Sequence, residues 1–250
     1  MVSPSGTPAD RTVGQHAEGT EMLERIDPDG AEPVSRRVFR ELRSAIVMMR
    51  FQPGLAVSEK EIADRFGVSR QPVREAFIKL AEAGLLSIRP QRGTFVVKIS
   101  AKQVYDVRFV REAVETAVVR KACADLPPNA ITTLRDNLRA QRDAADDERP
   151  DRFLGLDEAF HKGLALAAGC EYAWSVVEEM KAQMDRVRYL SLPEATPIPR
   201  LIDQHTRIVD AVEERDAGAA EAAMRVHLGE ILKSLPDLER RFPDLFAHET

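Results

Sequence analysis

Aromatic residues and cysteine are scarce in this chain, and it contains no long apolar run. One Trp and three Tyr disfavour base stacking on aromatic platforms, the mode of many single-strand binding proteins. The two cysteines, Cys123 and Cys170, provide neither a disulfide framework nor the spacing of a metal motif. No apolar run approaches the ~18 residues of a membrane span, and residues 1–30 lack the apolar core of a signal peptide. We therefore expect a cytoplasmic protein with no membrane partner.

The charges are distributed unevenly along the chain. Its 44% hydrophobic and 31% charged residues are ordinary for a globular protein, and 250 residues fit two small domains. Residues 34–98 hold 13 Lys and Arg against 6 Asp and Glu, whereas residues 99–250 hold 21 against 28 and residues 1–33 hold 2 against 7. An acidic chain with one basic segment indicates contact with phosphate by that segment alone.

Residues 58–81 have the pattern of two short helices joined by a turn. Ser58 and Glu61 form a capping box, so a helix is expected to begin at about residue 59. Gly67 is expected to end it in a left-handed conformation, and Ser69 to cap a second helix. The inward-facing apolar residues of the two helices are Ile62, Ala63, Phe66, Val73, Phe77, Leu80 and Ala81. This combination predicts a helix-turn-helix.

Two short β-prone runs follow the second helix. They cover residues 85–89 and 94–97, and residues 90–93 between them, Pro-Gln-Arg-Gly, have the composition of a turn. A two-stranded wing with a basic tip at Arg92 is therefore expected. A helix-turn-helix with a wing predicts a winged-helix unit that contacts double-stranded DNA.

The polar side of the second helix carries Arg70, Gln71 and Arg74. Arg70 and Arg74 are four residues apart and share a face, in the first turns of the helix, where recognition helices meet base edges. Arginine can donate two hydrogen bonds to guanine, and glutamine can bond adenine in the same way. A solvated charged face would explain an isolated arginine pair, but the cap, turn, helix and wing together favour recognition.

The chain is expected to be mainly α-helical. Residues 1–31 lack periodicity and predict a disordered tail, and residues 36–49 predict the first helix of a winged domain spanning residues 32–98. No strand pattern follows residue 97, so residues 99–240 predict an all-α bundle of six or seven antiparallel helices, with a tail at 241–250. The expected helices are 101–124, 129–146, 151–168, 171–191, 200–215 and 217–235, with a proline-containing loop at 193–199.

One carboxylate and three histidines lie on or beside apolar faces of these helices. Asp157 and His161 are four residues apart and point the same way, and His205 and His227 lie on two later helices. If these side chains converge inside the bundle, they could bind a divalent metal such as zinc, nickel or manganese. The alternative is that each histidine is a core residue with an ordinary hydrogen-bond partner.

The N-terminal motifs resemble the GntR family of bacterial transcription regulators. They are P-G-L at 53–55, S-E-K-E-I-A at 58–63, G-V-S-R-Q-P-V-R-E-A at 67–76, A-G-L-L at 83–86 and P-Q-R-G at 90–93. The resemblance implies DNA contacts at Lys60, Ser69, Arg70, Gln71, Arg74, Gln91, Arg92 and Gly93. Gln71 stands where the family usually has Thr or Asn, which affects the expected base preference.

Residues 105–228 resemble the FCD ligand-binding domain of the FadR subfamily of these regulators. The motifs are V-R-E-A-V-E at 110–115, D-E-A-F-H at 157–161, Q-H-T-R-I-V-D-A-V at 204–212 and A-M-R-V-H-L at 223–228. The resemblance implies a divalent metal held by Asp157, His161, His205 and His227. It also implies that Arg111 binds a carboxylate effector, although Arg111 could instead pair with Glu115, four residues on. Cys170 stands where the family usually has Asn.

Together these features predict a homodimeric DNA-binding regulator, a repressor rather than an enzyme. It would bind a short palindrome, and a small carboxylate held through the metal would control its operator affinity. Three alternatives are that the metal itself is the signal, that the metal is purely structural, and that the chain is a metal-dependent hydrolase. The hydrolase lacks support, because no H-E-x-x-H or comparable acid accompanies the histidines.

Overall fold

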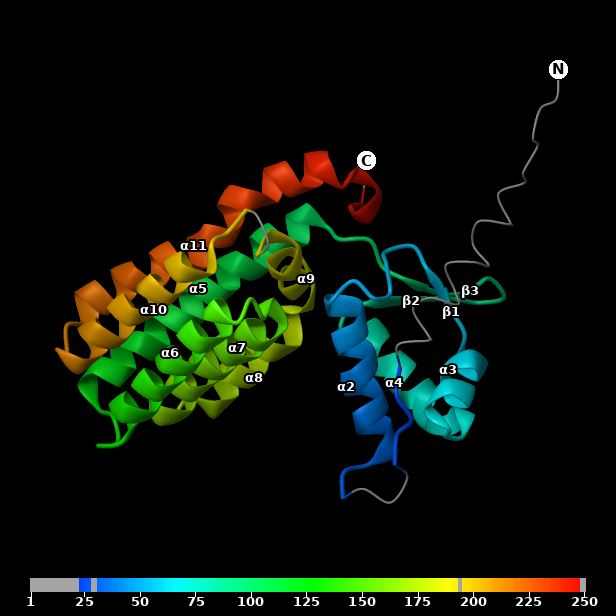
Figure 1. The fold of residues 1–250 in the computed structure, drawn as a ribbon, viewed down its shortest axis with the longest axis horizontal. Coiled ribbons are helices and arrows are strands. Elements are labelled where there is room, and N and C mark those ends of the chain that lie inside the picture. The colour runs from blue at the N-terminus through cyan, green and yellow to red at the C-terminus, as the bar shows by residue number, and fades with distance from the viewer. Residues whose placement is uncertain (1–22, 28–30, 193–194, 248–250) are drawn as a thin grey trace. The chain divides into compact units, whose positions relative to one another are not determined.

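The computed structural model describes residues 23–27, 31–192 and 195–247 and divides into two compact units (Figure 1). One unit comprises Met1–Ile99 together with Asp244–Thr250, and the other comprises Ser100–Pro243. The elements carry the labels of Figure 1. Among the described residues, no helix combines the length and the apolar character needed to cross a bilayer.

The first unit is a winged helix-turn-helix with a small antiparallel sheet. Its helices are α2 (Val34–Val47), α3 (Glu59–Phe66) and α4 (Arg70–Glu82), and its strands are β1 (Ala56–Val57), β2 (Leu86–Arg89) and β3 (Gly93–Val96). The sheet order is β1-β3-β2, and in the wing Leu86 lies opposite Val96. The sheet therefore contains a third strand, β1, in addition to the two expected strands of the wing. Its two residues are too few to show a periodic pattern in the sequence.

The helix-turn-helix forms much as its local sequence predicts. The Ser58 hydroxyl accepts a hydrogen bond from the Glu61 amide at 3.5 Å, and Gly67 is left-handed with φ 69°. Ser69 is the residue before α4, but its side chain makes no capping hydrogen bond, contrary to expectation. Helix α2 packs on α4, and their buried side chains form the core of the unit: Val38, Leu42, Ala45, Ile46, Val47, Val73, Ala76, Phe77 and Leu80.

Residues 23–27 correct the expectation of a disordered tail over residues 1–31. Leu23 and Ile26 are buried, and the Ile26 amide donates to the Phe66 carbonyl at 3.0 Å. The Arg65 side chain donates to the Leu23 carbonyl at 2.9 Å. Two apolar residues give no periodic pattern, so this docking is visible only when α3 is in place. Residues 1–22 and 28–30 lie outside the described part of the chain.

The end of the chain also belongs to the winged unit. After the 3₁₀ turn Pro243–Leu245, Phe246 pairs with Ile99 in a parallel bridge. The Ile99 amide donates to the Leu245 carbonyl at 2.9 Å, and the Ala247 amide donates to the Ile99 carbonyl at 2.8 Å. The chain thus leaves the winged unit after Ile99 and returns to it at Asp244. Residues 244–247 lie beside Ile99 instead of forming a separate tail.

Replacing Phe246 with alanine should therefore weaken the pairing of residues 245–247 with Ile99. Phe246 is 3% exposed, and a buried phenylalanine contributes about 3–5 kcal/mol relative to alanine. We expect a lower denaturation midpoint for the winged unit and faster hydrogen exchange at the amides of Ile99 and Ala247. Tyr172→Ala, which removes a side chain that is 82% exposed, is the matched control and should change neither. Unchanged hydrogen exchange at the Ile99 amide in the Phe246 variant would show that Phe246 does not stabilise this pairing.

The second unit is all-helical over its described residues. Its helices are α5 (Ala101–Ala124), α6 (Ala130–Asp146), α7 (Pro150–Ala167), α8 (Glu171–Met180), α9 (Ala182–Ser191), α10 (Ile198–Glu213) and α11 (Ala217–Arg241). Helix α5 contacts α7, α8, α9, α10 and α11, and α11 lies along its length (Figure 1). The capping box that starts α5 is confirmed, because the Ser100 hydroxyl accepts from the Gln103 amide at 3.1 Å.

Three helices differ from the sequence expectation. The single helix expected over 171–191 breaks at Lys181, whose ammonium turns inward to Asp185 at 2.7 Å and Glu158 at 3.1 Å. Helix α7 begins at Pro150, one residue before the expected start, and Arg149 is its N-cap. Helix α11 continues through Pro236 to Arg241. Burial of Leu235 and Leu238 beside that proline offsets its cost of about 3 kcal/mol.

Candidate metal centre and nucleic-acid interface

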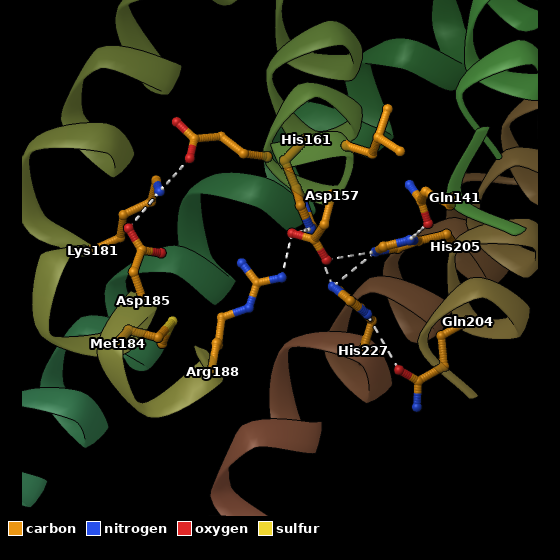
Figure 2. A network of polar contacts seen from close by, with 12 residues as sticks. Gln141, Asp157, His161, Lys181, Met184, Asp185, Arg188, Gln204, His205 and His227 are labelled. Carbon is orange, nitrogen blue, oxygen red and sulfur yellow. Dashed lines mark hydrogen bonds and ion pairs between the residues drawn. The ribbon is translucent and has the colours of Figure 1, made fainter. Parts of the chain in front are cut away.

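Four side chains from three helices meet in the core of the helical unit. Asp157 and His161 lie one turn apart on α7, His205 lies on α10 and His227 on α11 (Figure 2). All four are buried, and one ligand atom from each falls within 4.8 Å of the others. His227 Nε2 lies 3.1 Å from His161 Nε2 and 3.2 Å from His205 Nε2. The predicted ligand set is therefore brought together.

Outer partners determine which nitrogen of His205 and His227 carries the proton. His205 Nδ1 lies 2.9 Å from Gln141 Oε1, and His227 Nδ1 lies 3.2 Å from Gln204 Oε1. The amide group of Gln204 in turn donates to Glu230 at 2.8 Å, so its oxygen faces the imidazole. An oxygen partner requires Nδ1–H on each ring, which leaves the lone pair on Nε2.

Gln141, beside His205, and Glu115, beside His161, also present an oxygen to the Nδ1 atom of the imidazole. The Gln141 amide group donates to Asn137 Oδ1 at 2.7 Å, and Asn137 donates to the Leu156 carbonyl at 3.0 Å, so Gln141 also presents its oxygen. The Glu115 carboxylate lies 2.5 Å from His161 Nδ1. All three histidines are thus arranged with Nδ1–H outward and the Nε2 lone pair inward.

Three inward lone pairs at these distances repel one another unless a cation lies among them. Burial, together with the other imidazoles and Arg188, outweighs the opposing effect of Asp157, gives His205 a pKa of about 3 and holds the pKa of His227 well below its ordinary value. Burial by itself raises the pKa of Asp157, but Arg188 and the histidines outweigh it and leave the carboxyl ionised. One carboxylate and three imidazoles fit a divalent zinc, nickel or manganese ion.

Two arginines accompany the cluster, and only one was expected. Arg111 is buried, with Nε 2.5 Å from Glu115 Oε1 and Nη1 3.3 Å from Met184 Sδ. The internal ion pair considered from sequence therefore forms. Burial by itself raises the pKa of Glu115, but Arg111 and His161 lower it to about 2.

Arg188 is the residue that sequence reasoning missed. It lies on α9, is largely buried and pairs with Asp157 through Nη2 (Figure 2). It also borders a cavity of about 30 Å³ lined by Met184, Arg188, Ser191, Leu192, Thr196, Leu201, His227, Glu230 and Ile231. No sequence motif marks Arg188, because the 171–191 segment gives no sign of the break at Lys181 that directs α9 toward the cluster.

The predicted DNA-contacting residues all lie on the exposed surface of the winged unit. Lys60 lies on α3, Ser69, Arg70, Gln71 and Arg74 lie at the start of α4, and Gln91, Arg92 and Gly93 form the wing turn and the first residue of β3. Arg74 is held by Glu59 of α3, with nitrogen–oxygen distances of 3.2–3.4 Å, and Gln71 donates to Glu75 at 3.1 Å. In the wing turn Gln91 has φ 60° and Gly93 has φ 99°, which positions Arg92 at the tip.

Comparison with known proteins matches both units. Residues 34–96 match the bacterial regulatory proteins of the gntR family, and residues 106–230 match the FCD domain. The HTH-type transcriptional repressor RspR of Escherichia coli K12 is 45% identical over 218 residues, covering 87% of this chain and 96% of that protein. An uncharacterized HTH-type regulator of Streptomyces ambofaciens is 39% identical over 212 residues, covering 85% and 89%.

A solved structure agrees on the fold. E. coli McbR/YncC superposes with a TM-score of 0.72 at 17% identity, covering 84% of this chain and 99% of that one. The matched family and the relatives are transcriptional regulators and not enzymes, which excludes the hydrolase alternative. The chain therefore belongs to the GntR family of bacterial DNA-binding transcription regulators, with a winged helix-turn-helix followed by an FCD domain.

Proposed function

We propose that this regulator is a cytoplasmic repressor of the FadR subfamily that binds a palindromic operator as a homodimer. A small carboxylate bound in the FCD domain through a divalent cation would control its operator affinity. The observation that supports this most strongly is the convergence of the Nε2 atoms of His161, His205 and His227 beside an ionised Asp157. The residues proposed to contact DNA are Lys60, Ser69, Arg70, Gln71, Arg74, Gln91, Arg92 and Gly93.

Asp157, His161, His205 and His227 would hold the cation. A cation with four protein ligands would supply open coordination positions and positive charge for a carboxylate. Glu115, Gln141 and Gln204 would keep the histidines in the ligating tautomer through the contacts described above.

The charges around the cluster favour an anionic effector. Arg188 pairs with Asp157, and Arg111 pairs with Glu115, so these four buried groups are neutral in sum. A divalent cation would add two positive charges to a region shielded from water, and buried charge is costly unless it is compensated. A carboxylate ligand would compensate it and could accept two hydrogen bonds from an arginine.

Arg188 is better placed than Arg111 for that contact. Its side chain borders the cavity, together with the hydroxyl-bearing residues Ser191 and Thr196. Arg111 does not line that cavity, and it is already bonded to Glu115 and Met184. We therefore propose that Arg188 binds the effector carboxylate and that Arg111 orients Glu115, and through it His161.

Arg188→Met tests this assignment. We expect carboxylate affinity to fall by about tenfold to a hundredfold, because a charge-assisted hydrogen bond contributes roughly 1.5–3 kcal/mol. Metal affinity should not fall, since Arg188 competes with the cation for Asp157. Isothermal titration with zinc, nickel or manganese, and then with a panel of small carboxylates, measures both affinities.

Arg240→Met is the charge-matched control for Arg188→Met, because Arg240 is exposed and pairs only at the surface with Asp237. Carboxylate binding unchanged in the Arg188 variant would contradict the proposed contact. If the metal alone, with no carboxylate, changed operator affinity in the wild type, the regulator would instead respond to the metal itself.

A further inference from the structure

The short segment over residues 23–27 is held against the last turn of α3. The Ile26 amide donates to the Phe66 carbonyl at 3.0 Å. Arg65 Nε, from α3, donates to the Leu23 carbonyl at 2.9 Å. The side chains of Leu23 and Ile26 are buried, at 4% and 9% exposure. Two buried apolar side chains and two hydrogen bonds fix the backbone of the residues between them.

One of the residues between these anchors, Arg25, lies beside the turn of the helix-turn-helix. Its side chain is exposed, and a Cβ at Gly67 would lie 3.7 Å from Arg25 Nε and 3.9 Å from its Cγ and Cδ. The arginine side chain thus lies across the glycine that ends α3. Ser69, the residue before α4, is two residues further on, at most about 7 Å along the backbone. Arg25 is therefore close to the residues at the start of α4 that are proposed to contact DNA.

The Arg25 guanidinium is available to an anion from outside the chain. Within the part of the chain that the structure describes, it pairs with no carboxylate, whereas Arg74 is held by Glu59. Residues 34–98 hold 13 Lys and Arg against 6 Asp and Glu, so the surrounding surface attracts phosphate. An exposed arginine on a basic surface, beside the first turn of a recognition helix, suits a backbone phosphate of DNA.

We propose that residues 23–27 form a docked arm that places Arg25 on a DNA backbone phosphate next to the start of α4. The arm adds affinity and helps to orient α4 in the groove, but it reads no bases, because phosphate contacts carry no sequence information. The match to the gntR family begins at residue 34, so the arm lies outside the matched region. The proposal rests on the proposed function only for the number of arms in a complex, which is two in a homodimer.

The test is Arg25→Gln in the full-length protein, measured by fluorescence anisotropy with operator and scrambled fragments over a series of salt concentrations. Each lost phosphate contact lowers the slope of log affinity against log salt by about 0.9, so a dimer should lose about 1.8. Affinity at low salt should fall about 10–100-fold for both fragments, with the ratio between them unchanged. Arg139→Gln, on α6, removes a side chain that is 65% exposed and should change neither quantity.

Glu24→Gln separates a direct contact from an effect of net charge. Glu24 is exposed next to Arg25, and this substitution changes the charge of the arm by the same amount in the opposite direction. A direct contact by Arg25 predicts a much smaller change in the salt slope for Glu24→Gln than for Arg25→Gln. Equal and opposite changes in the slope would overturn the contact.

Ile26→Ser tests whether docking positions the arginine. It retains Arg25 but removes one of the two buried apolar anchors, so DNA affinity should fall toward that of Arg25→Gln. Thermal unfolding and circular dichroism show whether the variant is folded. A folded Ile26→Ser that binds DNA as wild type does would overturn the docked arm.

The outcomes separate this proposal from the proposed function. Unchanged affinity and slope in Arg25→Gln would overturn the arm and leave the proposed function intact, because a variant of Arg74 tests base recognition separately. A decrease in slope of about 0.9 instead of 1.8 would confirm the contact and contradict the homodimer, since only one arm would then meet DNA.

Discussion

Replacing Arg74 with alanine is expected to abolish sequence-specific operator binding and to leave the fold intact. Arg74 lies in the second turn of α4, exposed, and its guanidinium is held by Glu59 of α3. A bidentate arginine contact with a base is worth about 1–3 kcal/mol. Because a dimer uses the contact in both half-sites, the expected loss is about 2–6 kcal/mol, or at least roughly 30-fold in affinity.

The fold should survive because Arg74 contributes little to it. Its pair with Glu59 is exposed, and exposed ion pairs are worth about 0–1 kcal/mol. The thermal unfolding temperature of Arg74→Ala should therefore stay close to that of wild type. The charge-matched control is Lys79→Ala, which removes one positive charge from the last turn of the same helix.

Fluorescence anisotropy measures the DNA affinity of wild type and of both variants. The titrations use an operator fragment and a scrambled fragment at several salt concentrations. Wild type should bind the operator more tightly, with affinity falling as salt rises. Arg74→Ala should bind both fragments equally, whereas Lys79→Ala should retain the preference. If Arg74→Ala binds the operator as wild type does, α4 is not the recognition helix.

Asp157→Asn should remove metal binding. The substitution deletes the only acidic member of the four-residue set, and the amide cannot neutralise a cation. The loss should exceed the 10–100-fold that removal of an outer partner costs. It also leaves Arg188 without its partner carboxylate, and unpairing a buried ion pair costs about 3–5 kcal/mol, so the metal-free variant should unfold at a lower temperature than metal-free wild type.

Because Asp157→Asn weakens folding, a second variant keeps the test decisive. Gln141→Leu removes the hydrogen-bond acceptor of His205 Nδ1 without touching the ligand set, and it should weaken metal affinity by about 10–100-fold. Asp210→Asn is the control, because the Asp210 side chain is 47% exposed and its ion pair with Arg135 lies outside the ligand set.

Elemental analysis and calorimetric titration of chelator-treated protein give the metal content and affinity. Added metal should raise the unfolding temperature of wild type and of Asp210→Asn, since a ligand that binds only the folded state stabilises it. It should have a smaller effect on Gln141→Leu and none on Asp157→Asn. Equal metal affinity in Asp157→Asn and wild type would show that the four-residue cluster is not the binding site.

Local sequence was enough to predict the parts of this protein that depend on neighbours within one or two turns. The Ser58–Glu61 cap, the left-handed Gly67 and the extent of α5 all arise from contacts between residues close in the chain. The same holds for the Asp157–His161 pair, because one turn of helix places both side chains on one face. Periodicity and capping report such local interactions directly, so these features were predictable.

The features that join distant segments depend on how the helices pack in three dimensions. Arg188 meets Asp157 because α9 begins at the break after Lys181, and the histidine tautomers depend on Glu115, Gln141 and Gln204 from other helices. Residues 23–27 and 244–247 dock on surfaces that exist only after the winged unit has folded. Long-range packing depends on complementary shape and charge between segments, and neither property produces a periodic pattern in one segment alone.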